Sequence, residues 1–334
     1  MRDMTVSPAN SLRLRVGFVL ARRFTLSAFA NFVDVLRLAA DEGDRSRPIR
    51  CQWRVLAPSS QPVQSSCGIA VTPDEKLGDP SRFDYIVVVG GLIDEIERLE
   101  PDYIAFLHRA AQAGVPLVGV CTGAFILHRA GLMDGYRCCV SWFHHEDFLE
   151  QFDGLRPVSD QIYVVDRDRL TCSGGASSAH LAAFLIDRHI GRAAAQKSLH
   201  IMIIDEAMAP DDPQPGLPLD LATDDPLVRR ALLMLQQNMD TPPAVAEVAA
   251  HLQVSRRKLE RHFAASLAMS PADAFMRIRL SQVRMLLARP DRTISQIAAE
   301  TGFCDASHLI RVFRDASGMT PEQWRKTARQ DAAA

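Results

Sequence analysis

The sequence lacks the marks of several common protein classes. Its seven cysteines form no CxxC pair and no other spacing typical of metal ligands, so neither a disulfide framework nor a zinc site is expected. No apolar run approaches the roughly 18 residues that a membrane-spanning helix needs. We therefore expect a cytoplasmic protein that requires no membrane, metal or other cofactor.

The net charge is also small, because 38 basic residues are balanced by 40 acidic ones. The balance changes along the chain. Residues up to Ala222 include 22 basic and 28 acidic side chains, and the residues after it include 16 and 12, so the two parts carry −6 and +4. This asymmetry favours a second part that faces nucleic acid, although a solvated basic surface would give the same count.

A proline-rich segment divides the chain. Residues 209–225 read APDDPQPGLPLDLATDD, and the four prolines disfavour both helix and strand. At 334 residues the chain is long enough for two domains. We predict a first domain at residues 12–208, a linker at 209–225 and a second domain at 226–329.

Short apolar runs alternate with helical patterns in the first domain. Strands are predicted at Leu14–Leu20, Tyr85–Val89 and Leu117–Val120. A helix is predicted at Ser27–Ala40, where apolar residues recur every three or four positions. This alternation is typical of a largely parallel sheet with helices on both faces. The second domain shows no convincing strand and is expected to be all helical.

The second domain contains a helix-turn-helix pattern. Ser255 is placed to cap a helix predicted at Arg256–Ala265, in which Leu259 and Phe263 share the inward face. The helix before it has one apolar face at i, i+3, i+4 and i+7, formed by Val245, Val248, Ala249 and Leu252.

The same pattern returns about fifty residues later, which indicates an internal duplication. Gly302 and Phe303 form the turn, Asp305 is the cap, and Leu309 and Phe313 face inward. The apolar face of the preceding helix consists of Ile294, Ile297, Ala298 and Thr301.

A long helix is predicted between the two patterns, at Ala272–Ala288 with Pro271 at its start. Its apolar residues would hold both units rigidly, and two recognition helices fixed about 34 Å apart would enter successive major grooves. These apolar residues are Phe275, Ile278, Val283, Leu286 and Leu287.

The second domain resembles the AraC-type regulators. The stretch GFCDASHLIRVFRDASGMTPEQWR, residues 302–325, looks like that family's C-terminal signature, and SRRKLERHF, residues 255–263, is similar to the matching first segment. Geometry and resemblance together imply contacts with double-stranded DNA. An all-helical scaffold with solvated arginines is the alternative. Base contacts are expected from Arg257, Glu260, Arg261, Ser307, His308 and Arg311, and phosphate contacts from Arg256 and Arg314.

In the first domain, residues 118–123 read VGVCTG and join a buried strand to a helix predicted at Ala124–Ala130. This pattern is typical of a sharp elbow that exposes its central side chain, here Cys121, at the carboxyl edge of the sheet. The pair Gly90-Gly91 ends a neighbouring strand. We expect it to bring backbone N–H groups close to the same place as the N–H of Thr122.

The elbow resembles the class I glutamine amidotransferase-like superfamily, specifically the PfpI-like branch that is fused to AraC domains in GlxA-type regulators. The resemblance rests on VGVCTGAFILHRAGLMDG and the preceding VVVGGL, and it covers about Leu14 to Ala207. It implies a flavodoxin-like sandwich with Cys121 at the nucleophile position. The chain departs from the enzymes, because residues 21–31 contain no carboxylate and Thr122 follows the cysteine.

Three hypotheses follow for Cys121: a working nucleophile, an inherited elbow whose notch now binds a small effector, or plain packing. The missing catalytic partners favour the effector site, with Cys121 as a vestigial nucleophile. The residues expected to line that site are Ser27, Asn31, Gly91, Cys121, Thr122 and Trp142.

The sequence as a whole predicts a sequence-specific transcription regulator and no enzymatic activity. The resemblance implies a small nitrogenous effector such as an amino acid or amine, transcriptional activation, a homodimer, and RNA polymerase as a partner. The alternative is a cysteine-dependent hydrolase or amidotransferase-like enzyme tethered to DNA. A constitutive architectural DNA-binding protein is a third hypothesis.

Overall fold

The computed structural model describes residues 12–43, 45–96, 100–155, 157–214, 221, 223–287 and 292–331. Residues 215–220 and 222 of the predicted linker, and Ala288 of the predicted long helix, lie outside them. The chain forms two compact units, Met1–Asp212 and Pro213–Ala334. The boundary between the units lies within the segment that we predict as the linker.

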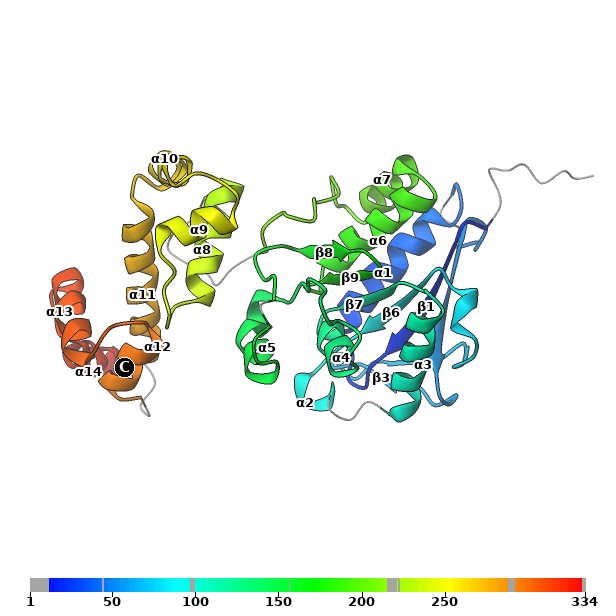
Figure 1. The fold of residues 1–334 in the computed structure, drawn as a ribbon, viewed down its shortest axis with the longest axis horizontal. Coiled ribbons are helices and arrows are strands. Elements are labelled where there is room, and N and C mark those ends of the chain that lie inside the picture. Colours follow the sequence, from blue (N-terminus) through cyan, green and yellow to red (C-terminus); the bar gives the residue numbers. More distant parts are fainter. Residues whose placement is uncertain are drawn as a thin grey trace, which may run out of the picture. The chain divides into compact units, whose positions relative to one another are not determined.

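The first unit is built on a seven-stranded sheet with the order β5-β2-β1-β6-β7-β9-β8 (Figure 1). All neighbouring strands run parallel except β8 and β9. A separate antiparallel pair joins β3, Val63–Gln64, to β4, Ala70–Val71. The strands of the main sheet are β1 Leu14–Leu20, β2 Cys51–Ala57, β5 Glu75–Lys76, β6 Tyr85–Val89, β7 Leu117–Val120, β8 Tyr163–Asp166 and β9 Arg169–Cys172.

The central strand β6 shows why this sequence forms a covered parallel sheet. All five of its residues are buried, as a strand between two layers of helices requires. Val87 and Val89 belong to the core on one face of the sheet, and Ile86 and Val88 belong to the core on the other. Alternate side chains therefore hold the two layers on opposite faces.

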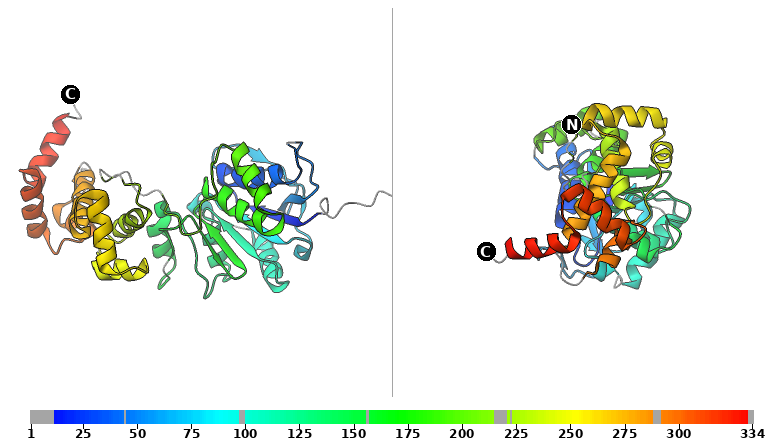
Figure 2. Two further views of the ribbon diagram at one scale, coloured as in Figure 1. Left: turned by 90° about the horizontal axis from the view of Figure 1, so that it is seen from above. Right: turned by 90° about the vertical axis from the view of Figure 1, so that its left-hand side faces the viewer.

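Helices cover both faces of the sheet (Figures 1 and 2). The core on one face includes residues of α1 Leu26–Ala39, α6 Ser177–His189 and α7 Arg192–Ile201. The core on the other includes residues of α3 Pro101–Gln112, α4 Gly123–Arg129 and α5 His145–Gln151. The shorter elements are α2 Ile93–Ile96, η2 Pro80–Arg82 and η3 Trp142–His144. The predicted α/β sandwich is confirmed.

The described residues of the second unit form helices joined by turns. They surround two small cores, and the long helix α11 contributes to both: Ala274 and Ile278 lie in the first core, and Val283 and Leu287 lie in the second. The helices are α8 Pro226–Gln237, α9 Val245–His251, α10 Arg256–Leu267, α11 Pro271–Leu287, α12 Ile294–Glu300, α13 Ala306–Ser317 and α14 Pro321–Asp331.

None of the helices in the described part of the chain combines the length and the apolar character that spanning a membrane requires.

Candidate nucleic-acid interface and ligand-binding site

The first helix-turn-helix unit consists of α9 and α10. The Val254 N–H donates to the Ala249 carbonyl over 2.9 Å and closes the turn. The Ser255 hydroxyl accepts the Lys258 N–H at 3.2 Å, so Ser255 is the N-cap of α10. Leu259 and Phe263 are fully buried. The opposite side of α10 is therefore left to solvent.

The second unit, α12 and α13, repeats this geometry. The Phe303 N–H donates to the Ala298 carbonyl over 2.8 Å, and Asp305 caps α13 by accepting the His308 N–H at 2.7 Å. Leu309 and Phe313 are fully buried. The second turn is one residue longer, because the offset is 49 between Val248 and Ile297 but 50 between Phe263 and Phe313.

The duplication also includes the connection to a third helix, which the sequence patterns had not indicated. Ala268 ends α10 with a left-handed φ of 54°, and Gly318 ends α13 with a φ of 75°. Pro271 and Pro321 then begin α11 and α14. The two units are thus helix-turn-helix motifs, each followed by a helix with the same start.

Most of the side chains predicted to contact DNA are exposed. Glu260 and His308 are the half-buried members of the set. Arg256 and Glu260 form an ion pair at 2.8 Å, so the Glu260 carboxylate has a partner in the protein alone. The His308 ring packs edge-on against Phe303, and its Nδ1 is buried, which leaves Nε2 as the nitrogen that can face a base. The exposed members are Arg256, Arg257, Arg261, Ser307, Arg311 and Arg314.

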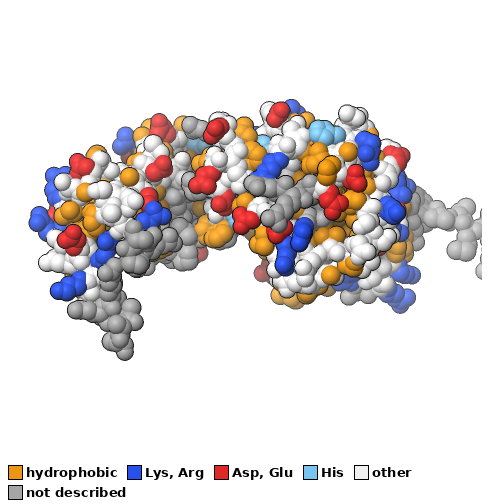
Figure 3. All heavy atoms as spheres, turned by 90° about the horizontal axis from the view of Figure 1, so that it is seen from below, with side chains coloured by type: hydrophobic (Ala, Val, Ile, Leu, Met, Phe, Trp, Pro, Cys, Tyr) orange, Lys and Arg blue, Asp and Glu red, His pale blue; other side chains and the backbone are white. Residues whose placement is uncertain are grey.

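The sequence prediction of the DNA-binding surface does not include two basic residues that the structure makes notable. Lys258 is exposed on α10 beside Arg257, and its position next to a predicted contact was the available signal. Arg279 of α11 is buried, donates to the Thr301 carbonyl over 2.6 Å and lies 3.9 Å above the Phe303 ring. It therefore holds the second turn against α11. Figure 3 shows other basic side chains on the surface of the second unit, interspersed with acidic ones.

In the first unit of the chain, Cys121 lies at a sharp elbow between β7 and α4. Its φ of 58° is in the left-handed region, where a non-glycine residue is strained. A Cβ on Gly123 would collide with the Val88 carbonyl oxygen, and one on Gly174 would lie 2.7 Å from the Cys121 Cβ. Glycines are therefore needed for the backbone to pass this closely on both sides of the elbow.

The Cys121 thiol is poorly suited to be a nucleophile. Burial raises its pKa, and the hydrogen bonds with the Thr25 hydroxyl, at 3.4 Å, and the Thr122 N–H offset only part of that effect. Of the two histidines that follow the elbow in the sequence, His144 pairs with Asp147 at 2.7 Å, and His145 bonds to Ser159 at 2.8 Å. The thiol form is favoured at neutral pH, whereas nucleophilic attack needs the thiolate.

The residues predicted to line a pocket at the elbow have mixed surroundings. The Thr122 hydroxyl donates to the Gly91 carbonyl over 2.8 Å, and Thr122 is only 1% exposed. Asn31 donates to the Gly175 carbonyl over 3.2 Å. Both side chains therefore brace loops. Ser27 is exposed in the first turn of α1, and Trp142 is half-buried at the start of η3. A role for these residues in binding stays a prediction.

The backbone N–H groups that we expect from Gly90-Gly91 near Cys121 are also partly engaged. The Gly90 N–H donates to the Val120 carbonyl over 3.0 Å and so belongs to the sheet. The adjacent Gly91 is packed so closely that a Cβ there would collide with the Arg23 carbonyl. The glycine pair thus allows close packing of the two loops.

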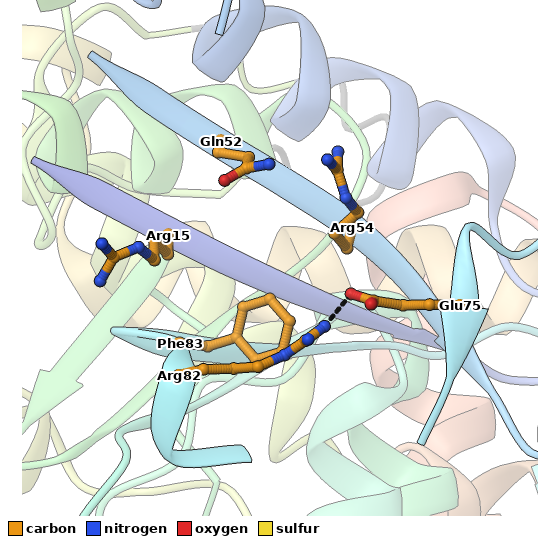
Figure 4. A pocket seen from close by; sticks show the side chains of 6 residues that line it. All are labelled: Arg15, Gln52, Arg54, Glu75, Arg82 and Phe83. Carbon is orange, nitrogen blue, oxygen red and sulfur yellow. Dashed lines mark hydrogen bonds and ion pairs between the residues drawn. The ribbon is translucent and has the colours of Figure 1, made fainter. Parts of the chain in front are cut away.

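A groove of about 360 Å³ lies on β1 and β2 (Figure 4). Arg82 pairs with Glu75 and lies 4.9 Å from the Phe83 ring centre, while Arg15 and Arg54 add positive charge. Gln52 completes the lining. The groove lies along the strands rather than beyond their carboxyl ends.

A second cavity, of about 250 Å³, lies where β1 and β2 end. Arg22 follows β1, and Glu95, Glu100 and Tyr103 follow β6. The other lining residues are Leu20, Ala57, Pro58, Ser59, Gln61, Pro62, Val63 and Gln64. This cavity combines both signs of charge with an aromatic ring, a combination that the sequence patterns did not indicate.

Comparison with known proteins matches both units. The model of the DJ-1/PfpI family matches residues 15–187, and a helix-turn-helix domain model matches residues 248–327. The HTH-type transcriptional regulator GbdR of Pseudomonas aeruginosa is 31% identical over 324 residues, which cover 96% of this chain and 86% of GbdR. The HTH-type transcriptional regulator GlxA of Rhizobium meliloti is 28% identical, over 93% of this chain and 95% of GlxA.

The first unit is also similar to an enzyme. The isonitrile hydratase of Pseudomonas putida is 30% identical over 190 residues, which cover 55% of this chain and 76% of the hydratase.

Proposed function

Because this chain belongs to the DJ-1/PfpI family and, over nearly its whole length, to the helix-turn-helix transcription regulators, we propose that its first unit binds a small molecule and its second unit converts binding into regulated contact with DNA. The resemblance to PfpI-like domains fused to AraC-type domains, as in GlxA-type regulators, is confirmed.

The pair of helix-turn-helix units carries this proposal. α10 and α13 each bury one face through a leucine and a phenylalanine and expose arginines on the other. α11 contributes to the cores of both helix-turn-helix units, so it fixes their spacing. Two rigidly spaced helices with exposed arginines suit two successive major grooves.

Selection from a pool of random DNA duplexes with the full-length protein tests this role. We expect the selected sequences to share two short elements about 10 base pairs apart, one helical turn. A pool without any enriched sequence would contradict sequence-specific binding. Binding that has no sequence preference and is unaffected by every metabolite tested would favour the constitutive architectural role.

In this proposal, the α/β unit at the start of the chain regulates DNA binding. An effector controls DNA binding only if it binds one arrangement of the protein more tightly than another. In the proposed mechanism a small nitrogenous metabolite is the effector, the protein acts as a homodimer, and contact with RNA polymerase leads to activation.

A cysteine-dependent enzyme is the second candidate, supported by the likeness to isonitrile hydratase and by the strained elbow. The raised pKa of Cys121 and the absence of a carboxylate from residues 21–31 oppose it. The substitution Cys121→Ser separates the two. A regulator keeps its response to effector without any turnover, whereas an enzyme has measurable turnover that the substitution abolishes.

A further inference from the structure

The 250 Å³ cavity, which we call the switch-point cavity, lies at a special place in the sheet. From β1 the chain proceeds outward to β2 on one side, and from β6 it continues to β7 on the other. The loops after β1 and β6 therefore diverge, and Arg22 and Glu95 line the cavity from these two loops. In open parallel sheets, ligands bind in the crevice outside the carboxyl ends of the strands at this switch point.

Charges of opposite sign line the switch-point cavity. Arg22 Nε lies 3.6 Å from Glu95 Oε2, with side chains 68% and 23% exposed. The cation is thus nearer solvent, and the anion is nearer the interior. Ion pairs with so exposed a partner stabilise a protein only weakly, so a ligand that carries both charges can replace this pair. Glu100 adds a second carboxylate to the lining.

Tyr103 adds a polar and aromatic contact deeper in the cavity. It is only 6% exposed and lines the cavity. Burial, assisted by the negative charge of Glu100, raises its pKa to about 12, so the hydroxyl keeps its proton. A tyrosine hydroxyl at the wall of a cavity can form a hydrogen bond with a ligand, and the face of the ring attracts cations.

The volume limits the size of the ligand. A water molecule occupies about 30 Å³ in the liquid, so the cavity has room for a ligand of roughly ten non-hydrogen atoms. Drug-sized ligands need larger pockets.

We infer that the switch-point cavity binds the effector, and that the effector is a small zwitterion whose carboxylate meets Arg22 and whose ammonium group meets Glu95 beside Tyr103. The elbow is the competing location, but Thr122 and Asn31 are engaged there with backbone carbonyls. The groove of Figure 4 has three arginines and one glutamate, which suits an anion rather than a zwitterion. This inference rests on the proposed function, because it assigns a location to its effector.

The test uses the full-length protein and the twenty standard L-amino acids as probes, each titrated by calorimetry. We expect at least one to bind. Its two single-charge analogues, the amine without the carboxylate and the acid without the amino group, are expected to bind at least tenfold more weakly. If none of the twenty binds, the inference is overturned, while selection of specific DNA would still support the regulator.

Variants locate the site. Arg22→Gln, Glu95→Gln and Tyr103→Phe should each weaken binding of that amino acid at least tenfold and leave the DNA affinity without ligand unchanged. Arg15→Gln, in the groove of Figure 4, is the matched control and should bind as before. If Cys121→Ser or Asn31→Ala weakens binding and the three cavity variants do not, the elbow is the site and the inference is wrong, although the regulator stands.

Discussion

The two helix-turn-helix units have the same backbone plan but are held in place differently. In the first turn, Gln253 adopts a left-handed φ of 55° with its side chain exposed. In the second turn, Gly302 has a φ of 65°, and a Cβ there would collide with the Met239 carbonyl oxygen. The second turn is therefore packed against the segment after α8, and the first is not constrained in this way.

The first helix-turn-helix unit has an attachment of its own, to the end of the predicted linker. Asp225 Oδ2 lies 2.6 Å from His262 Nδ1 on α10, and the hydroxyls of Thr223 and Ser266 are in contact. Leu221 is buried in the first core. The comparison teaches that one local motif is positioned by different partners: the first recognition helix by the linker, and the second turn by α11 and the segment after α8.

The largest expected effect tests what the two units share. Phe263→Ala and Phe313→Ala each remove a fully buried ring, so each should lower the free energy of unfolding by about 3–5 kcal/mol. Urea denaturation of the two variants measures this. Val312→Ala, at a half-buried position, is the control with a smaller expected loss. A loss below about 1 kcal/mol for either variant would mean that the core around that phenylalanine is less tightly packed than the core around the other one.

Gly302→Ala tests the difference between the turns. The added methyl group collides with backbone rather than with a movable side chain, so we expect a loss of about 2 kcal/mol or more in the free energy of unfolding. Gln253→Ala in the first turn should change it by about 0.5 kcal/mol or less, because the side chain is exposed. Equal losses in urea denaturation would contradict the proposed asymmetry.

Arginine substitutions test whether both units contact DNA. Arg261→Ala and Arg311→Ala should each weaken specific binding by about 1–3 kcal/mol and relax preference at one base step, in different halves of the site. Fluorescence anisotropy with the selected duplex measures the loss. Arg229→Ala, an exposed arginine of α8, should bind normally. Unchanged affinity for both variants would overturn the groove assignment.

The linker attachment gives the smallest effect. Asp225→Asn keeps an N-cap for α8 but removes the charge that faces His262, so we expect a loss of about 0.5–1 kcal/mol in stability. Asp305→Asn keeps the cap of α13 and is the control with almost no expected loss. If the two variants are equally stable by urea denaturation, the contact with His262 does not hold the first helix-turn-helix unit in place.

The same attachment predicts a pH dependence. Burial would raise the pKa of Asp225, but the hydrogen bonds from His262 and from the Val228 and Leu227 N–H groups outweigh it and lower the pKa. A lowered pKa in the folded state stabilises the protein above the unfolded value, about 4, and this contribution is lost as pH falls through the folded value. Asp225→Asn should therefore differ from the parent chain less at pH 3 than at pH 7.

Much of the second unit could be predicted because it depends on contacts between close neighbours in the chain. The caps Ser255 and Asp305 and the inward phenylalanines occupy their predicted places. Buried Arg279 could not be predicted, because an arginine in an amphipathic helix is usually exposed. Only the approach of the second turn to α11 explains its burial.

The candidate ligand sites were harder to predict. The glycine pattern correctly indicated the elbow at Cys121, because close backbone passage requires particular residues at particular positions. The pattern did not reveal that Thr122 and Asn31 brace loops, since the same polar side chains would suit a pocket.

The sequence by itself determined the strands β1, β6 and β7, the elbow, and the duplicated helix pairs. Periodicity, caps and glycines act over a few residues, so each of these features is encoded where it occurs. The tertiary structure alone decided which loops meet: the strand order brings Arg22, Gln61 and Glu95 around one cavity, although they are far apart in the chain. Such a site depends on long-range packing, and no local pattern specifies it.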